Sequence, residues 1–307
     1  MSAPDLRLAA LRRFAVAITV LNVCGRLWLG FESSWAQMFV ALGTAYLVEF
    51  VLEVADARAN QRPYKFAGGW VRAVDFLLPA HISGLAVSML LYAGGLLLPF
   101  AFASAVGIAS KALFTAPVNN ARRHFLNPSN TGIAVTFLLF PVVAPSVPYQ
   151  FTEYLSGGAS RALPVLVLCV GTFMNWRYTG RMPLVLSWVA AFAVQGVVRC
   201  LLNGLPLSVG LAPMTGVAFV LFTFYMITDP GATPSRWKGQ VVFGAATALV
   251  YAALMMAHVG FALFYSLLVV SAARGLLLHL TAARSRPNQK LETDFSLLVI
   301  DCRRLRD

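Results

Sequence analysis

Charged side chains are scarce in this sequence, since Lys, Arg, Asp and Glu fill only 12% of its 307 positions. A soluble domain carries about 25% charged residues, so the composition excludes an ordinary soluble fold. Hydrophobic residues instead make up 59% of the chain, and apolar runs recur along almost its whole length. Because a helix of about 20 apolar residues crosses a bilayer, the sequence predicts a multi-pass protein whose main partner is the lipid bilayer.

Acidic residues are the scarcer of the two charge types: 12 Asp and Glu stand against 24 Lys and Arg, a formal net charge of +12. Such an excess can indicate a nucleic-acid partner. Here the cations are spread over short loops and form no basic face with interleaved aromatic residues, so we exclude nucleic acid. The enrichment of Lys and Arg in cytoplasmic loops of membrane proteins explains the excess instead.

Only four cysteines occur, and none stands at a CxxC or other metal-ligand spacing. We therefore expect no metal site and no iron–sulfur cluster within the chain. A Gly-rich dinucleotide fingerprint after a strand is also missing, so the chain is not expected to take hydride from NADH by itself. No residue is assigned a catalytic role.

The apolar runs are continuous rather than alternating, which favours helices over a β-barrel. The predicted fold is all-α: a polytopic membrane bundle of about ten transmembrane helices over residues 1–282, followed by a cytoplasmic tail over 283–307. The expected spans are 14–30, 36–55, 71–93, 96–117, 128–146, 162–176, 183–202, 211–228, 239–257 and 260–282. Whether they divide into two inverted halves of five, as in many transporters, stays open.

Basic residues also predict the orientation of the bundle. If the N-terminus is cytoplasmic, the loops on its side hold most of the cations, and the other side holds little beyond Arg161 and Arg199. The sequence thus places both termini in the cytoplasm and the protein in the inner or plasma membrane of the cell.

The first of two polar motifs is RRHFLNPSNTGIAV, residues 122–135, named here the Asn-Pro motif. Asparagine is a good N-cap and proline is favoured at the first helical position, so Asn127 and Pro128 predict a helix start. A helix N-terminus flanked by cations is a natural anion site; plain capping is the alternative. The candidate residues for such a site are Arg122, Arg123, Asn127, Ser129 and Asn130.

The second is YMITDPGATPSRWKGQVVFG, residues 225–244, named here the Asp-Pro motif. Thr228 and Asp229 again precede a proline, Pro234 prevents the helix from running on, and Lys238 opens the next helix. Both motifs fall on the cytoplasmic side in the predicted topology. They are therefore expected to frame one site, unless each is only a tight turn.

Ionisable residues inside predicted spans are costly and usually face a bundle interior or a cavity. Glu49 and Glu53 are four residues apart and share a helix face, and Asp56 follows them. These three carboxylates are candidates for an ion path, and Lys111 is a candidate ligand-binding cation. Because each lies near an expected helix end, snorkelling to the interface is the alternative.

The two motifs and Lys111 together resemble the NqrB/RnfD family, the membrane subunits called D in the Rnf electron-transport complex and B in the sodium-pumping NADH:quinone reductase. SKALF followed by RRHFLNPSNTGI is similar to the family's Ser-Lys, basic loop and His-to-Asn-Pro pattern. FTFYMITDPGATPSRWKGQVVFG is similar to its aromatic-rich helix that ends in Thr-Asp-Pro, with a Lys-Gly turn after it. The short chain also resembles stand-alone members encoded with enediyne biosynthesis genes.

The resemblance implies a flavin. In the family, one FMN is joined through its phosphate to a threonine of a Ser-Gly-Ala-Thr motif in the outer loop between the fifth and sixth helices. The matching loop here is YLSGGASRAL, residues 154–163, and Ser160 would be the acceptor in place of threonine. The implied cofactor is FMN or riboflavin, with Ser160 at the outer side and these residues at the inner side: Lys111, Arg122, Arg123, Asn127, Ser129, Asn130, Thr228, Asp229 and Lys238.

The function implied by the resemblance is electron transfer by a flavin-carrying membrane subunit, with redox partner proteins and a cation that moves along Glu49, Glu53 or Asp56. An enediyne biosynthesis cluster would be its context. A transporter that exports a small hydrophobic natural product is the alternative from another class. A scaffold subunit that keeps the fold without a cofactor is a third. The outer loop separates these, because only the redox hypothesis needs a flavin acceptor there.

Overall fold

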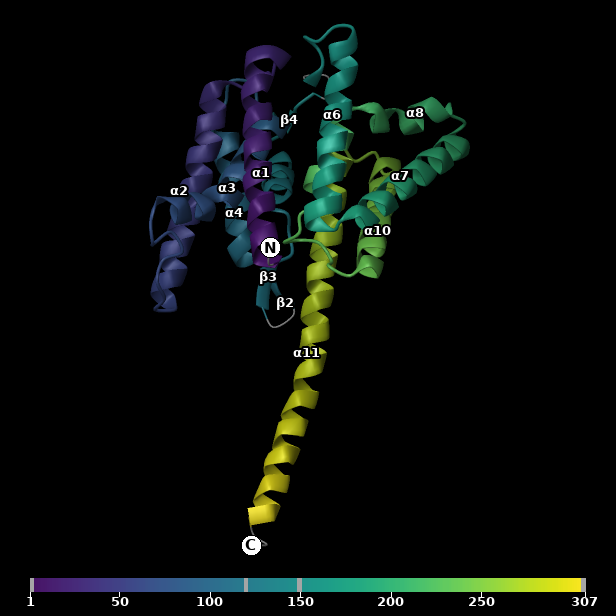
Figure 1. The fold of residues 1–307 in the computed structure, drawn as a ribbon. Coiled ribbons are helices and arrows are strands. Elements are labelled where there is room, and N and C mark those ends of the chain that lie inside the picture. Colours follow the sequence, from purple (N-terminus) through teal and green to yellow (C-terminus); the bar gives the residue numbers. More distant parts are fainter. Residues whose placement is uncertain (1–2, 119–120, 148–150, 305–307) are drawn as a thin grey trace.

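The computed structural model describes the backbone of residues 3–118, 121–147 and 151–304, and within these ranges the side chains from Leu8 to Arg284. Helices dominate the structure (Figure 1). The helices and helical turns are α1 (Ala3–Cys24), η1 (Gly25–Leu29), α2 (Trp35–Ala59), α3 (Trp70–Leu90), α4 (Leu98–Leu113), α5 (Pro128–Leu139), α6 (Gly158–Met174), η3 (Asn175–Thr179), α7 (Met182–Asn203), α8 (Leu207–Leu211), η4 (Ala212–Thr215), α9 (Val217–Leu221), η5 (Phe222–Met226), α10 (Trp237–Met256) and α11 (Ala262–Arg304).

Two short antiparallel strand pairs complete the described elements. β1 (Leu91–Tyr92) pairs with β4 (Ala144–Pro145), and β2 (Thr115–Val118) pairs with β3 (Ala121–His124). The second pair is a hairpin that projects from one end of the bundle (Figure 1). We call this the hairpin end. The basic loop expected before the Asn-Pro helix is therefore one strand of this hairpin.

Seven helices in the described part of the chain are long and apolar enough to cross a membrane, at Leu8–Leu29, Trp35–Ala59, Trp70–Leu90, Gly158–Thr179, Met182–Asn203, Trp237–Met256 and Ala262–Arg284. An eighth span forms if Leu207–Thr215 and Val217–Met226 are taken together, although they bend by 64° at Gly216. Gly216 has an extended backbone, and Pro213 cannot continue the preceding helix. The all-α class and the multi-pass character are confirmed.

The count of ten spans stays a prediction, because two of the expected spans are short helices. α4 has 16 residues and α5 has 12, whereas about 20 are needed to cross a bilayer. Proline limits both: Pro99 opens α4, and Pro141 follows α5. The last span ends at Arg284, close to the predicted boundary at 282, and α11 continues from there to Arg304, beyond the bundle at the hairpin end (Figure 1). Of the predicted tail, 305–307 lie outside the described residues.

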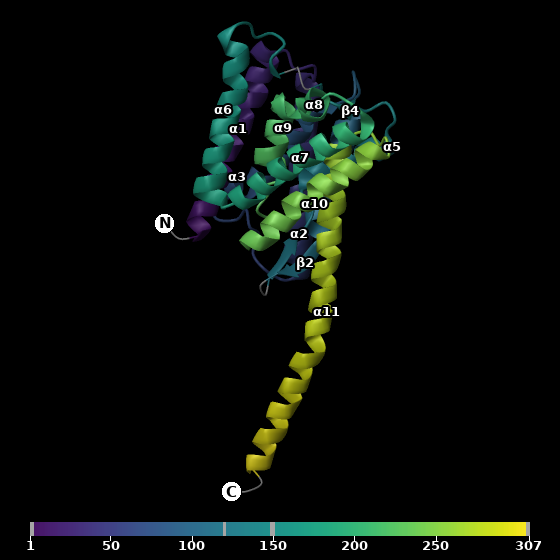
Figure 2. The ribbon, with the colours of Figure 1, turned by 90° about the vertical axis from the view of Figure 1, so that its right-hand side faces the viewer.

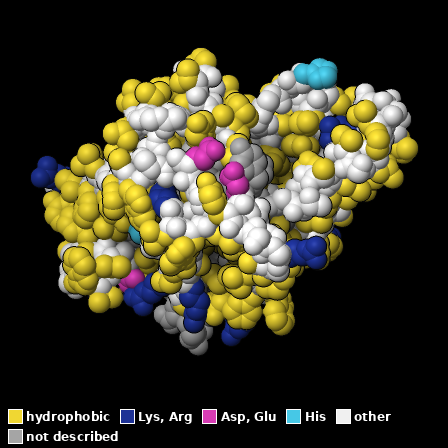
Figure 3. Space-filling view, turned by 90° about the horizontal axis from the view of Figure 1, so that it is seen from above, with side chains coloured by type: hydrophobic (Ala, Val, Ile, Leu, Met, Phe, Trp, Pro, Cys, Tyr) yellow, Lys and Arg dark blue, Asp and Glu magenta, His cyan; other side chains and the backbone are white. Residues whose placement is uncertain are grey.

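The asymmetry of the cations follows the predicted pattern. The loops at the hairpin end hold most of the Lys and Arg residues, and α11 leaves the bundle at the same end. Figure 3 looks onto the opposite end, where apolar side chains dominate and two acidic side chains lie near the middle. Arg26 is one further cation toward the opposite end, where its guanidinium donates to Ser33 Oγ at 2.8 Å.

The chain consists of two halves that repeat one order of helices. In each half the first helix ends in a π-helical turn followed by a left-handed glycine, Gly30 after η1 and Gly180 after η3. α4 packs on α2 and α5, as α10 packs on α7 and α11. α1 rises from the hairpin end while α6 descends toward it (Figures 1 and 2). The second half is thus inverted relative to the first, as in many transporters.

Glycine allows α4 and α5 to approach closely. A Cβ atom at Gly132 would lie 2.0 Å from the carbonyl oxygen of Ala103, and one at Gly107 would lie 2.6 Å from that of Pro128. Both obstacles are backbone atoms, which cannot move aside without shifting a helix. This contact fixes the start of α5, and with it the Asn-Pro motif, against α4.

We predict that Gly132→Ala lowers the free energy of unfolding by about 1–3 kcal/mol, because the added methyl group overpacks the α4–α5 contact. The matched control is Gly43→Ala in α2, where a Cβ atom would meet nothing within 4 Å. The control should be neutral or stabilising, because Ala favours helix over Gly. Thermal unfolding of the purified protein in detergent measures both, and equal melting temperatures would contradict the packing explanation.

Candidate functional site: a cleft between the two halves

A cleft of about 970 Å³ separates α1 and α3 in the first half from α6, α9 and η5 in the second. Along α1 it extends from Ala10 to Cys24, a helix rise of about 21 Å, and it continues to Leu29 of η1. The residues of α1 that line the cleft recur every three or four positions and so form a stripe along one face of the helix, and the lining residues of α6 do the same. These stripes are Leu11, Phe14, Ile18 and Leu21, and Leu163, Val167, Val170 and Met174.

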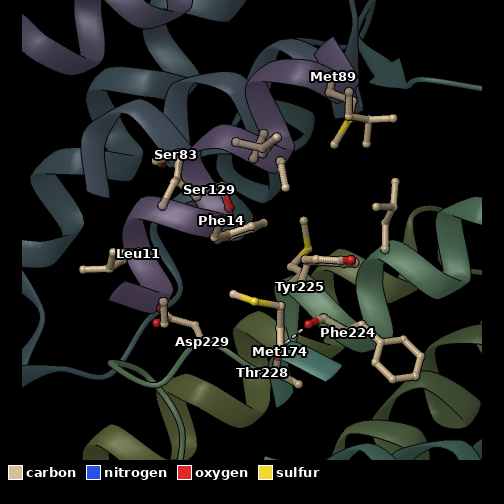
Figure 4. Close-up of a pocket in the computed structure, with 18 of the residues that line it drawn as sticks. Leu11, Phe14, Ser83, Met89, Ser129, Met174, Phe224, Tyr225, Thr228 and Asp229 are labelled. Atoms are coloured by element: carbon tan, nitrogen blue, oxygen red, sulfur yellow. Dashed lines mark hydrogen bonds between the residues drawn. The ribbon is translucent and has the colours of Figure 1, made fainter. Parts of the chain in front are cut away.

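Aromatic side chains make contacts near both ends of the cleft. At the hairpin end the Arg13 guanidinium lies 4.8 Å from the Tyr178 ring centre, and Phe14 stacks on Tyr225 at 5.4 Å. At the opposite end Phe31 meets Phe151 edge to face at 5.0 Å. The space between is lined mostly by apolar side chains, and its polar groups gather at the hairpin end (Figure 4).

The Asn-Pro and Asp-Pro motifs meet at this polar end, as the sequence predicted. Asn127 caps α5 as expected, since its Oδ1 accepts from Asn130 N at 3.0 Å. Its Nδ2 also donates to the Met226 carbonyl at 2.9 Å. One side chain thus starts a helix of the first half and holds the end of η5 in the second.

A second asparagine, at the start of η3, also donates to a carbonyl of η5. Asn175 Nδ2 donates to the Phe224 carbonyl at 2.7 Å and also lies 2.9 Å from the Gly171 carbonyl. Thr228 Oγ1 donates to the same Phe224 oxygen at 2.7 Å. The carbonyls released at the end of η5 are therefore satisfied by side chains, which a break inside an apolar bundle requires.

Asp229 faces the histidine of the Asn-Pro motif across the mouth of the cleft. His124 Nε2 lies 3.6 Å from Asp229 Oδ2, with both side chains about four-fifths buried, at 20% and 22% exposure. Asp229 Oδ1 accepts from the Gly231 backbone N–H at 2.9 Å. The Asp-Pro turn therefore points its carboxylate at the first half of the chain.

Two arginines hold the rest of the Asp-Pro turn. Arg181 Nε donates to Thr233 Oγ1 at 2.9 Å, and Arg274 Nη1 donates to the Ala232 carbonyl at 2.7 Å. Burial lowers the pKa of the Arg181 guanidinium, nearby Asp229 counteracts that shift, and Arg123 adds to it. The turn is thus held in place by Arg181, which directly precedes α7, and by Arg274 of α11.

Five of the predicted site residues line the cleft or its mouth: Lys111, Asn127, Ser129, Thr228 and Asp229. Lys111 is held by Glu49, whose two carboxylate oxygens lie 2.8 and 2.7 Å from its Nζ. Asn130 lies behind the wall, where its Nδ2 donates to the Phe264 carbonyl at 3.0 Å.

The other predicted residues of the hairpin end do not line the cleft. Arg122 lies on β3 and donates to Thr115 Oγ1 at 3.0 Å. Arg123 is an exposed neighbour on the same strand. The Lys238 ammonium lies 5.7 Å from the Trp237 ring centre on α10. The cations of the two motifs are therefore spread around the mouth rather than gathered in one anion site.

Ser160 lies toward the opposite end, on the first turn of α6. Its Oγ donates to the Gly157 carbonyl at 2.9 Å. Ser160 precedes Leu163 by one turn and continues the spacing of the α6 stripe that lines the cleft. Ser160 itself is not among the residues that line the cleft.

The three carboxylates considered for an ion path are each paired with a cation. Glu53 is bonded by Arg62 at 2.6 Å and by Lys65 Nζ at 3.0 Å, and Asp56 pairs with the same Arg62. Glu53 first, and Asp56 after it, raise the pKa of the Arg62 guanidinium. With Glu49 bonded to Lys111, the three form two neutralised clusters on α2.

Sequence reasoning missed the contribution of η3. Asn175, Tyr178 and Thr179 line the mouth of the cleft, and Asn175 bridges to η5. The available signal was NWRYTG, residues 175–180, an asparagine within a late apolar run that ends at a helix-terminating glycine. Phe14 on α1 was also missed, because one aromatic residue in an apolar span carries no distinguishing pattern.

No protein-family model matches this sequence, and no curated protein matches it significantly.

We predict that Asn127→Ala lowers the free energy of unfolding by about 2–3 kcal/mol, because it removes a helix cap and leaves the buried Met226 carbonyl without its donor. Asn127→Ser keeps a capping oxygen but loses the bridge, so its loss should be about half as large. Asn203→Ala removes an exposed side chain that bonds its own helix, and should change stability by less than about 0.5 kcal/mol. Melting temperatures in detergent rank the three variants; a serine variant as stable as wild type would show that the bridge contributes nothing.

The Glu49–Lys111 pair gives a second prediction. Both side chains are largely buried, at 15% and 18% exposure, so Glu49→Gln should cost about 2–4 kcal/mol by leaving the ammonium unpaired. The double variant Glu49→Gln with Lys111→Met should recover much of this loss. Asp75→Asn is the control, since its partner Arg12 is 51% exposed and such pairs contribute about 0–1 kcal/mol. Denaturant unfolding measures all three, and a double variant no more stable than the single one would contradict the pairing.

Proposed function

We propose that this protein binds a flavin, FMN or riboflavin, in the cleft between its two halves and serves as an electron-transfer subunit in a membrane. One observation supports this above the others: the two motifs that resemble the NqrB/RnfD family, about 100 residues apart in sequence, line a single cleft. The proposal includes the plasma membrane as its location, with both termini in the cytoplasm. Redox partner proteins would supply and remove the electrons, and enediyne biosynthesis would be the context.

The cleft suits a flavin in size and lining. Its volume of about 970 Å³ lies at the upper end of the range of about 300–1,000 Å³ for small-molecule sites. Phe14, Phe224, Tyr225 and Met174 offer flat or polarisable surfaces for a ring system (Figure 4). His124, Ser129 and Asp229 offer hydrogen-bonding groups at the hairpin end. The residues present therefore fit an amphipathic planar ligand.

The two ends of the cleft suit different parts of a flavin. At the hairpin end, the cation that lines the cleft is Lys111, and Glu49 neutralises it. Asp229 adds a carboxylate at the same mouth. A phosphate is therefore better accommodated near Ser160, and the hairpin end suits an uncharged ring or ribityl group. This division supports Ser160 as the attachment position for FMN.

The flavin itself would supply the redox chemistry. The protein would contribute an apolar enclosure, aromatic contacts to the ring, and hydrogen bonds at the mouth. Ion transport along Glu49, Glu53 and Asp56 lacks similar support, because each carboxylate is bonded to a cation.

One feature favours the transporter alternative. The cleft lies between two inverted halves whose contacts run mainly through α11 with α5 and β2, and through α1 with η3. Transporters with inverted repeats bind substrate between the repeats and move one against the other. A hydrophobic natural product would find a largely apolar cleft of suitable length. A flavin that stays bound through purification would distinguish the redox function from export.

We predict that the detergent-purified protein is yellow and that its band fluoresces after denaturation, which indicates a covalent flavin. Ser160→Ala should abolish the fluorescence of the denatured band, whereas Ser160→Thr should retain it. Ser156→Ala is the matched control, because Ser156 lies in the same loop and is exposed. A yellow protein with no fluorescent band would leave a non-covalent flavin. A colourless protein from cells with ample flavin would contradict the proposed function and favour transport.

A further inference from the structure

His124 is a titratable residue at the mouth of the cleft, and the proposed function gives it no proton chemistry. It ends β3, lines the cleft and is 20% exposed. Its Nε2 lies 3.6 Å from Asp229 Oδ2, which is beyond hydrogen-bonding distance, and the described residues make no hydrogen bond to either ring nitrogen. Neither nitrogen is sealed from solvent, in contrast to buried, unbonded atoms such as Ser83 Oγ. A molecule in the cleft can therefore reach the imidazole.

The surrounding backbone fixes the position of the His124 ring. The hairpin register pairs His124 with Thr115. The Nε2–Cε1 edge of the ring packs on Gly231, where a Cβ atom would lie 2.3 Å from Nε2. The Gly231 N–H also donates to Asp229 Oδ1 at 2.9 Å. The Asp-Pro turn thus holds a carboxylate beside Nε2, which favours a hydrogen on that nitrogen and leaves Nδ1 for a ligand.

Other ionisable side chains that line the cleft are engaged within the protein. Lys111 is bonded to Glu49, and Tyr225 Oη donates to the Val167 carbonyl at 3.0 Å. Histidine is the side chain that ordinarily changes its charge near neutral pH. His124 is therefore the lining residue best suited to gain and lose a proton under cellular conditions.

The charged groups around the His124–Asp229 pair are mainly arginines. Arg181, which precedes α7, interacts electrostatically with Asp229 and with Arg123 of β3, and Arg274 of α11 interacts with Arg181. Guanidinium groups stay protonated at physiological pH. A change of pH therefore alters the charge at this mouth chiefly through His124 and Asp229.

We propose that His124 is the proton-exchanging residue of this cleft and that Asp229 is its positioning residue. When an electron pair reaches a flavin ring bound in the cleft, His124 Nδ1 gives a proton to a ring nitrogen: an imidazolium N–H bond breaks and a ring N–H bond forms. The electron pair comes from the reduced partner protein of the proposed function, on which this inference rests. His124 then regains a proton from water at the mouth.

The first test needs no electron transfer. The chain holds four histidines, so labelling the imidazole nitrogens of flavin-depleted protein in nanodiscs gives few NMR signals, which single glutamine variants assign. Riboflavin should shift the His124 signals and leave those of His279, an exposed histidine on α11, unchanged. In the neutral ring the hydrogen should reside on Nε2, and Asp229→Asn should weaken that preference, because the carboxylate beside Nε2 is lost.

The second test measures the proton step by stopped-flow reduction of protein-bound riboflavin with dithionite, followed by flavin absorption. His124→Gln should slow the reduction by about 100-fold, the lower end of the effect of a general acid. It should also remove the pH dependence that the wild type shows relative to free riboflavin. His279→Gln is the matched control, since His279 is exposed and does not line the cleft, and its pH profile should equal that of the wild type.

The outcomes separate this inference from the proposed function. Riboflavin that binds without shifting the His124 signals, or that is reduced equally fast in His124→Gln and wild type, overturns the role of His124 and leaves the flavin proposal intact. If His124→Gln fails to fold, as its melting temperature would show, the NMR shifts of the wild type still decide. Failure of the wild type to bind riboflavin overturns the proposed function, and this inference with it.

Discussion

The carbonyl oxygens of Phe224 and Met226 impose the constraint on which the site depends. They lie at the end of η5, where the chain leaves its helix inside an apolar bundle and cannot rely on water. Asn175 and Asn127 donate to them from opposite sides, one from the end of α6 and one from the start of α5. The polar side chains at this end of the cleft thus largely serve to satisfy backbone carbonyls, and their location follows from where η5 ends.

This solution also joins the two halves. Asn127 belongs to the first half and Met226 to the second, and Asn130 adds a bond from α5 to the Phe264 carbonyl of α11. Farther from the hairpin end, the cleft lies between the apolar stripes of α1 and α6. Because the halves are tied at one end, the polar groups at that end keep fixed positions while the apolar walls remain adaptable. A site of this kind can orient a ligand by its polar edge.

Much of this arrangement could be predicted from the sequence, because it depends on local signals. The long helices follow from apolar runs, and the cap at Asn127 follows from an asparagine before a proline. The alternating direction of successive predicted spans also predicted that Asn127 and Asp229 would lie on the same side of the bundle. The short lengths of α4 and α5 and the bend at Gly216 were not predicted, because hydropathy measures apolar content and is insensitive to where proline and glycine end a helix within it.

The partners of the charged residues could not be predicted, for a different physical reason. Lys111 was expected to bind a ligand, and Glu49 to conduct an ion, yet the two neutralise each other between α4 and α2. A charge in an apolar bundle must find a partner, but the sequence does not show which of several cations and carboxylates come into contact. Asn175 illustrates the same limit, since its role depends on a carbonyl 49 residues away.

The pairing of these charges bears on the kind of chemistry the cleft can host. A transported ion needs carboxylates that can exchange their partners, whereas Glu53 is bonded to Arg62 and Lys65 at once. A bound cofactor needs the reverse: a rigid mouth and a dry interior. The paired charges at the hairpin end and the apolar lining meet that second description. These features are the ones on which the proposed flavin site depends, whereas the inverted halves alone are equally compatible with transport.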